Sequence, residues 1–217
     1  MYKVTTEDYP YPTKKGYFVD SRFVKLSRAK PMPRLSTLSP KEVIIGRLLS
    51  AVGSDYVWGG NRKDGVPEML TYYPPLKPLS ENKRNKWMFK GVDCSGLLYE
   101  ATNGFTPRNT SSLLHFGKPV NIAGLSADQI IRKVKSLDLI VWDGHVIIVL
   151  GKGRVIESRL DHDKGLPGDQ GGVKVSDLKE VLSELLKGRI PVNNYADNVR
   201  GVRKKFVLRR WHEVKGS

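Results

Sequence analysis

The chain has 217 residues, of which 39% are hydrophobic, a formal net charge of +15 and one cysteine. No apolar stretch approaches the roughly 18 residues of a membrane-spanning helix, and the first residues lack the apolar segment of a secretory signal peptide. We therefore expect a globular, cytoplasmic protein without a membrane span. A lone cysteine excludes an internal disulfide and the paired thiols of zinc ribbons.

The positive charge favours association with polyanions or with small acidic molecules. The Lys and Arg residues are dispersed along the chain and are not interleaved with aromatic residues as in a base-stacking surface. A solvated basic surface is therefore the preferred interpretation, and we do not expect a nucleic-acid partner. Residues 200–210, "RGVRKKFVLRR", are predicted as an edge strand whose basic side chains block unwanted pairing.

The first residues of the chain differ in composition from the rest. Residues 1–38 are rich in Pro, Tyr and Lys, contain one predicted strand and are too short for a core of their own. We expect an N-terminal extension here and one main domain over residues 39–217. The polar, Pro-rich residues 61–90 are predicted as an insertion in that domain, beside the functional site.

The first firm helix signal follows the extension. A helix is predicted over residues 40–52, with Ser39 as its N-cap and Glu42 completing a capping box.

The only cysteine lies in "GVDCSGLLYEATNGF", residues 91–105. Asp93 is a good N-cap and Gly104 a natural stop, so we predict a short helix whose first turn contains Cys94. The positive end of the helix dipole favours a thiolate at this position. A buried structural cysteine is the alternative interpretation, and the polar neighbours argue against it.

The segment "SLDLIVWDGHVIIVLGKGRVIES", residues 136–158, is predicted as an antiparallel meander of three strands. Pairing Leu150 with Arg154 across a three-residue loop places His145 and Glu157 on one face as diagonal neighbours, about 7 to 8 Å apart at the backbone. A carboxylate there can orient the imidazole. A hydrogen-bonded structural histidine is the alternative, but a thiolate together with an oriented histidine favours nucleophilic catalysis.

Four blocks in this order resemble the NlpC/P60 cysteine peptidases, papain-like enzymes that cut peptidoglycan stem peptides. The blocks are "SDYVWGG" (54–60), "DCSGLL" (93–98), "PRNTSSLLHFG" (107–117) and the Asp-Leu and His-Val strands (138–158). The resemblance spans about residues 40 to 160. It implies an α+β, papain-like fold in which helices pack on a central antiparallel sheet and the nucleophile lies at a helix N-terminus.

The resemblance also implies roles for individual residues. The implied catalytic residues are Cys94 as nucleophile, His145 as general base and acid, and Glu157 as third member. The implied substrate-binding residues are Tyr56, beside the nucleophile, and Asp93 and Ser95, which would hold the free amino group of a substrate L-Ala. No metal or other cofactor is required.

Some positions depart from the family pattern. The third member is usually His, Asn or Gln, so His162 stays open as an alternative to Glu157. Leu137 stands where the family usually has Gly, so the local turn is expected to differ from that of the family. Arg108 is interpreted as an internal salt-bridge anchor.

For substrate, the resemblance implies hydrolysis of the γ-D-Glu to meso-diaminopimelate bond in peptides with a free N-terminal L-Ala, in cell-wall turnover or recycling. In such relatives an SH3-like module closes the pocket, and we leave open whether residues 1–38 are its remnant or a replacement, with Glu7, Asp8 and Tyr9 as candidates for binding the amine. The alternative function is a non-catalytic basic protein that binds polyanions such as nucleic acid, or that binds muropeptides.

Overall fold

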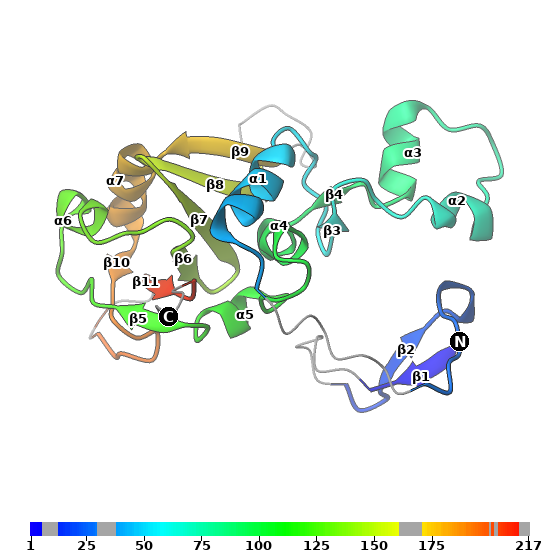
Figure 1. The fold of residues 1–217 in the computed structure, drawn as a ribbon, viewed down its shortest axis with the longest axis horizontal. Helices are drawn as coiled ribbons and strands as arrows, with labels where there is room; N and C mark the ends of the chain where they lie inside the picture. The colour runs from blue at the N-terminus through cyan, green and yellow to red at the C-terminus, as the bar shows by residue number, and fades with distance from the viewer. Residues whose placement is uncertain (6–12, 30–37, 161–170, 200, 202–203, 213–217) are drawn as a thin grey trace.

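A seven-stranded sheet forms the centre of the protein (Figure 1). The computed structural model describes residues 1–5, 13–29, 38–160, 171–199, 201 and 204–212. The strand order is β10-β11-β6-β7-β8-β9, and β5 pairs with β11. The strands are β5 (Lys118–Val120), β6 (Leu139–Trp142), β7 (His145–Gly151), β8 (Arg154–Leu160), β9 (Gly171–Asp177), β10 (Ile190–Pro191) and β11 (Lys205–Arg210). All these pairings are antiparallel except that of β10 with β11. The predicted edge strand over residues 200–210 is wrong, because β11 has β6 on one side and β5 and β10 on the other.

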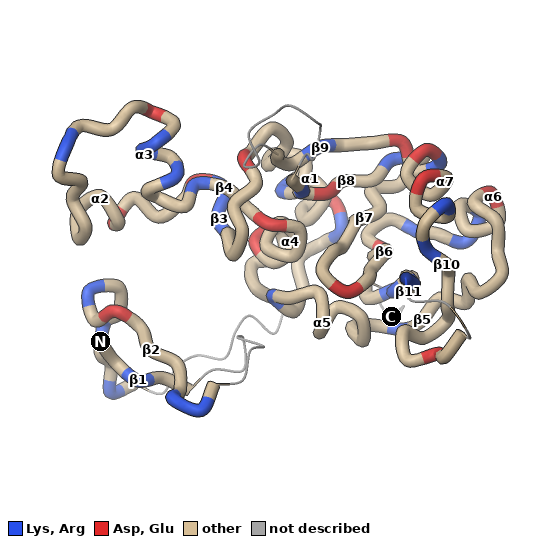
Figure 2. Tube along the Cα trace, turned by 180° about the vertical axis from the view of Figure 1, so that it is seen from behind, with Lys and Arg blue, Asp and Glu red and all other residues tan. Residues whose placement is uncertain are grey.

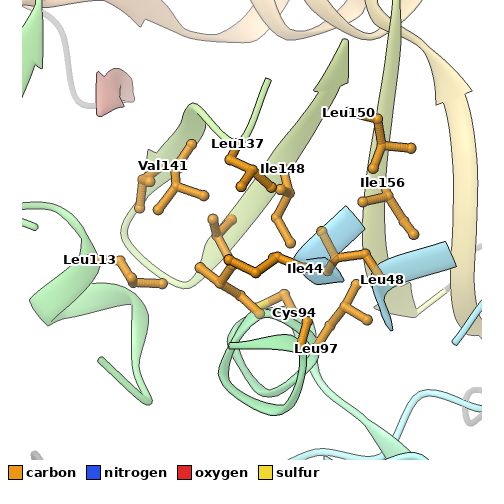
Figure 3. Close-up of a cluster of buried hydrophobic side chains, with 14 of the residues drawn as sticks. Ile44, Leu48, Cys94, Leu97, Leu113, Leu137, Val141, Ile148, Leu150 and Ile156 are labelled. Atoms are coloured by element: carbon orange, nitrogen blue, oxygen red, sulfur yellow. The ribbon is translucent and has the colours of Figure 1, made fainter. Parts of the chain in front are cut away.

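Helices cover both faces of this sheet, which confirms the predicted α+β class. The helices are α1 (Lys41–Ser50), α4 (Cys94–Ala101), α5 (Thr110–Leu113), α6 (Ala127–Ile131) and α7 (Leu178–Gly188). Successive residues of a strand point to opposite faces. Ile148 of β7 accordingly packs in one buried cluster with α1 and α4, whereas Ile147 and Val149 pack in a second cluster with α6 and α7. Figure 3 shows the first cluster, in which Ile44 and Leu97 converge on the strands.

The hairpin of β7 and β8 keeps the predicted register along its body, because Ile148 lies opposite Ile156. The predicted three-residue loop is wrong, since Arg154 pairs with Gly151 after a shift of the ladder by one residue. Residues 152–153 alone form the turn, and both have positive φ angles, 51° and 72°. Such angles belong to a two-residue type I′ turn, whose twist matches the flanking strands.

The predicted start of α1 is wrong. Pro40 occupies the N-cap position with an extended ψ of 147°, and no side chain caps the helix. The hydroxyl of Ser39 instead accepts a hydrogen bond of 3.4 Å from the guanidinium of Arg47, so the predicted capping box with Glu42 does not form. The helix also ends two residues earlier than predicted, at Ser50.

Leu137, which replaces the usual glycine, adopts a left-handed backbone with a φ of 69°. Its side chain is buried, its N–H donates to the carbonyl of Val149 at 2.7 Å, and its carbonyl accepts from the indole of Trp211 at 2.7 Å. Tertiary contacts therefore hold a leucine in a conformation that glycine adopts without strain.

Residues 61–90 leave the sheet region through a small antiparallel ladder of β3 (Asn61–Arg62) and β4 (Gly91–Val92). Between these strands lie the short helices α2 (Glu68–Tyr72) and α3 (Glu81–Trp87). The two ends of the segment are adjacent in space. A segment of this kind can be accommodated without disturbing the sheet, because its entry and exit already pair with each other.

The N-terminal residues contact this segment. Strands β1 (Tyr2–Val4) and β2 (Tyr17–Val19) pair, and the 3-10 turn η1 (Ser21–Phe23) follows. Arg22 donates to the carbonyl of Tyr72 at 2.8 Å, and the ring centroid of Phe23 lies 5.1 Å from that of Tyr72 in an edge-on arrangement. In Figure 2, Lys and Arg are spread over β1, β2, α3 and the central sheet, as the dispersed sequence pattern predicts.

Candidate active site

The cysteine lies at the start of α4, as predicted. Asp93 is the N-cap, and its Oδ1 accepts a hydrogen bond of 2.7 Å from the N–H of Gly96. Cys94 is the first helical residue and is 6% exposed. The first N–H groups of a helix have no partner within it, so those before Gly96 can donate to an oxygen beside the thiol. This geometry suits a thiolate nucleophile and the oxyanion it generates.

A close contact between two sequence blocks holds the start of α4 in place. The N–H of Asp93 donates to the carbonyl of Gly60 at 3.0 Å. A Cβ atom at Gly96 would collide with that same carbonyl oxygen, so only glycine fits there. The backbones of the "WGG" and "DCSG" blocks are therefore in direct contact at Gly60 and Gly96. The sequence patterns did not predict this contact.

The structure brings together the three predicted catalytic residues. The Sγ of Cys94 donates to the carbonyl of Gly144, the residue before His145, at 3.9 Å, and the Cys94 side chain is one of the groups that raise the pKa of the His145 ring. The Nε2 of His145 lies 2.7 Å from the Oε2 of Glu157, which confirms the predicted contact between these two side chains. Glu157 is 2% exposed. His162, the alternative third member, lies outside the described residues, as do residues 7–9.

The electrostatics of His145 favour the protonated ring. Burial lowers its pKa, but hydrogen bonds and charge interactions with Cys94 and Glu157 outweigh that effect and raise the pKa to about 9. An imidazolium between a thiol and a carboxylate is thus stable over a wide pH range. The arrangement can supply an imidazolium next to the thiol, and this imidazolium is the general acid that acyl transfer requires.

Two aromatic residues border these groups. Burial raises the pKa of Tyr56 to about 12, and negative charge at Cys94 and Asp93 adds to the shift, so the phenol stays protonated as a hydrogen-bond donor. The ring of Trp142 lies 4.9 Å from that of His145, centroid to centroid. Trp142 is not among the predicted site residues, although the Asp-Gly turn that follows it brings it opposite His145.

Asp93 and Ser95 are embedded in a network centred on Arg108. Arg108 binds both carboxylate oxygens of Asp93, at 3.0 and 2.9 Å, and donates to the hydroxyl of Ser95 at 3.0 Å. This confirms Arg108 as an internal salt-bridge anchor. Three more donors reach the same carboxylate, namely the N–H groups of Gly59 and Gly96 and the hydroxyl of Ser95. A substrate ammonium at Asp93 would therefore share its oxygens with Arg108.

No family model matches the chain. The probable endopeptidase YafL of Escherichia coli (strain K12) is 28% identical over 124 residues, which are 54% of this chain and 39% of that protein. The chain thus spans well under half of this relative.

Solved structures of low similarity include NlpC/P60 proteins, the family that the sequence blocks predict. An NlpC/P60 family protein from Bacillus cereus ATCC 10987 is 16% identical, with a TM-score of 0.43 over 81% of this chain and 41% of that one. RipD from Mycobacterium tuberculosis, described as a non-catalytic NlpC/p60 domain protein, is 21% identical, with a TM-score of 0.41 over 78% of this chain and 95% of that one. A mutant of the Resuscitation Promoting Factor Interacting protein RipA is 22% identical, with a TM-score of 0.39 over 70% of this chain and 62% of that one.

None of the helices in the described part of the chain has the length and apolar character that crossing a bilayer requires.

Proposed function

We propose that this protein is an NlpC/P60 cysteine peptidase that hydrolyses the γ-D-Glu to meso-diaminopimelate bond of peptidoglycan-derived peptides in the cytoplasm. The observation that carries the proposal is the position of Cys94 at the start of a helix, with its Sγ on the carbonyl of Gly144, next to the hydrogen-bonded pair of His145 and Glu157. The similarity to a probable endopeptidase supports it. Acidic peptides also suit a chain with a net charge of +15.

The proposed reaction is acyl transfer through a thioester. The thiolate of Cys94 attacks the carbonyl carbon of the scissile amide, and N–H groups at the start of α4 stabilise the resulting oxyanion. His145 donates its proton to the leaving nitrogen as the C–N bond breaks. Neutral His145 then removes a proton from water, whose oxygen attacks the thioester and releases the acid and the thiol. Glu157 keeps the imidazole oriented through both halves of the reaction.

Substrate binding by Tyr56, Asp93 and Ser95 is part of the proposal. Tyr56 presents a protonated phenol near the thiol, where it can donate to the substrate. A free L-Ala ammonium would bind next to Asp93. Acetylation of that amine should therefore lower kcat/KM strongly, in a comparison of free and acetylated L-Ala-γ-D-Glu-diaminopimelate. Equal rates would mean that Asp93 serves only the network around Arg108.

Incubation with L-Ala-γ-D-Glu-diaminopimelate, followed by mass spectrometry of the products, tests the reaction itself. We expect L-Ala-D-Glu and free diaminopimelate, and no products from the Cys94→Ala variant. A non-catalytic role such as that described for RipD is the competing outcome. Rapid alkylation of Cys94 at pH 6 accompanies an activated thiol, whereas slow alkylation and intact peptide would support a protein that only binds.

A further inference from the structure

Exposed apolar side chains gather in one part of this molecule. Eleven of the seventeen large hydrophobic residues that are exposed in the described part of the chain lie in the accessory region, residues 1–29 and 61–90. This region supplies little more than a quarter of the described residues. Figure 1 shows its helices α2 and α3 at one end of the molecule, away from the central sheet. Apolar surface that is concentrated in this way marks an interaction site.

Three aromatic rings of the accessory region are fixed beside one another. The indole N–H of Trp87, at the end of α3, donates to the carbonyl of Tyr73 at 2.8 Å. The ring of Phe23 stacks with that of Tyr73, with the centroids 6.4 Å apart. We call Phe23, Tyr73 and Trp87 the aromatic cluster, and each of these residues is 36% to 40% exposed. The contacts hold the rings in place without removing them from solvent.

Leu76 lies in the loop between α2 and α3 and is fully exposed. The surrounding sequence "PPLKP", residues 74–78, contains three prolines. Proline fixes φ and stiffens the loop, which therefore loses little conformational entropy when it binds. A leucine presented in this way gains free energy when an apolar phase covers it.

Phe89 follows α3 with a left-handed backbone, a φ of 52°, and is exposed. Its N–H donates to the carbonyl of Lys86 at 3.1 Å, and the N–H of Lys90 donates to that of Asn85 at 2.9 Å, which are the two bonds of a Schellman motif. Glycine is the usual residue at this position, because it adopts a positive φ without strain. Phenylalanine bears the strain without joining the core, so its side chain is available for an external contact.

These apolar groups lie in a strongly basic region. The described residues of the accessory region include thirteen Lys and Arg against four Asp and Glu. Figure 2 shows basic residues along α3, and Lys77 and Lys90 are exposed next to Leu76 and Phe89 in the chain. Two copies of this surface would repel each other, which disfavours self-association. A partner that offers negative charge together with an apolar phase complements the surface.

Single-stranded nucleic acid and a lipid bilayer both combine negative charge with apolar groups. Bases stack on aromatic rings but leave aliphatic side chains without a partner. A bilayer accepts both kinds, since aromatic rings lie at the level of its headgroups and aliphatic chains at the acyl boundary. The accessory region exposes several aliphatic residues besides Leu76, among them Val24 and Leu26. Its composition therefore favours the bilayer.

We propose that the accessory region docks the protein on the surface of an anionic lipid bilayer. Leu76, Phe89 and the aromatic cluster enter the boundary between headgroups and acyl chains, while the basic residues of α3 lie at the lipid phosphates. Lys and Arg near such a surface are attracted to it, and salt screens this attraction. The inference is independent of the proposed peptidase chemistry, because none of these residues belongs to the candidate active site.

Sedimentation of the full chain with phosphatidylcholine vesicles, with and without phosphatidylglycerol, tests this proposal. We expect binding to the vesicles that contain phosphatidylglycerol, and a loss of that binding as the salt concentration rises. Leu76→Ala should weaken the binding by roughly three- to tenfold, because less apolar surface is buried. Leu49→Ala is the matched control, since Leu49 is an exposed leucine of α1 outside the accessory region, and it should bind as the parent does.

Phe89→Gly separates docking from folding. Relief of the strained backbone should leave the thermal transition unchanged or raise it, while vesicle binding falls by roughly three- to tenfold. Cys94→Ala should bind vesicles as the parent does, so a failure of the peptidase proposal would not affect this result. No preference for the anionic vesicles, or binding that Leu76→Ala and Phe89→Gly leave unchanged, would overturn the proposal. Binding of a single-stranded oligonucleotide without binding of vesicles would overturn it in favour of nucleic acid.

Discussion

Two ion pairs of the same residue types distinguish the two regions of this molecule. In the sheet region, residues 39–60 and 91–212, Asp93 and Arg108 form a two-pronged pair whose side chains are 11% and 17% exposed. In the accessory region, residues 1–29 and 61–90, Asp20 and Arg22 form a similar pair that is 23% and 45% exposed.

The contacts around the two pairs also differ, because the Asp93 pair lies in the interior and the Asp20 pair lies at the surface. Asp93 caps the helix that carries the nucleophile and accepts from backbone groups of two loops. Asp20 and Arg22 join surface elements, with Tyr73 hydrogen-bonded to Asp20 and lying 4.0 Å from the Arg22 guanidinium. Helices α2 and α3 have no buried residue among those described. The lesson is that burial, not residue type, decides how much such a pair contributes.

The largest effect should come from removing the thiol. Cys94→Ala should lower turnover of the diaminopimelate peptide by roughly 10⁴- to 10⁶-fold, because loss of a nucleophile removes the covalent step. Circular dichroism should show both regions folded as in the parent. Residual turnover close to the parent rate would exclude Cys94 as nucleophile and leave the sheet region without its proposed chemistry.

Asp93 and Asp20 allow a direct test of whether burial decides the contribution of each ion pair. Asp93→Asn should reduce the free energy of unfolding by roughly 3 to 5 kcal/mol, since it leaves Arg108 buried without its counter-charge and weakens the cap of α4. Asp20→Asn, the matched change in the accessory region, should leave the urea midpoint nearly unchanged. Equal shifts of the two midpoints would show that burial is not the deciding factor.

A smaller, pH-dependent effect should follow from Glu157→Gln. The carboxylate contributes to raising the His145 pKa to about 9, so its loss should move the alkaline limit of activity to lower pH by about one unit. The raised pKa also stabilises the fold below pH 6.5, and this contribution is lost as the pH rises through about 9. Between these pH values the melting temperature should fall less in the Glu157→Gln variant than in the parent.

His162→Ala serves as the control for that profile. We expect it to keep the parent's pH dependence and nearly the parent's rate. A nearly inactive His162→Ala protein together with an unchanged Glu157→Gln profile would make His162 the third member.

The smallest effect should come from the accessory contacts. Tyr73→Ala removes the partner of Asp20 and Arg22, so limited proteolysis within residues 13–29 should become faster while peptide turnover and the main thermal transition stay unchanged. Phe18→Ala, exposed on β2, is the control and should not accelerate cleavage. A parallel loss of turnover in Tyr73→Ala would show that the accessory region supports the site.

Local patterns in the sequence predicted the features that depend on neighbouring residues. The N-cap at Asp93 and the pairing of His145 with Glu157 follow from helix capping and strand alternation, and the structure shows both. The predicted start of α1 is wrong because the Ser39 hydroxyl pairs with Arg47, eight residues later in the chain, instead of with the backbone. The predicted turn before Arg154 is one residue too long, because strand twist favours a two-residue connection.

By itself, the sequence determined the α+β class, the helix that presents Cys94 and the register that brings Glu157 to His145. Only the tertiary structure decided that Arg108 occupies both oxygens of Asp93 and that Arg189 lines a cavity together with His145. The physical reason is the range of the forces involved. Capping and alternation act over a few residues along the chain, whereas ion pairs and cavities join residues that only the packing of helices on the sheet brings together.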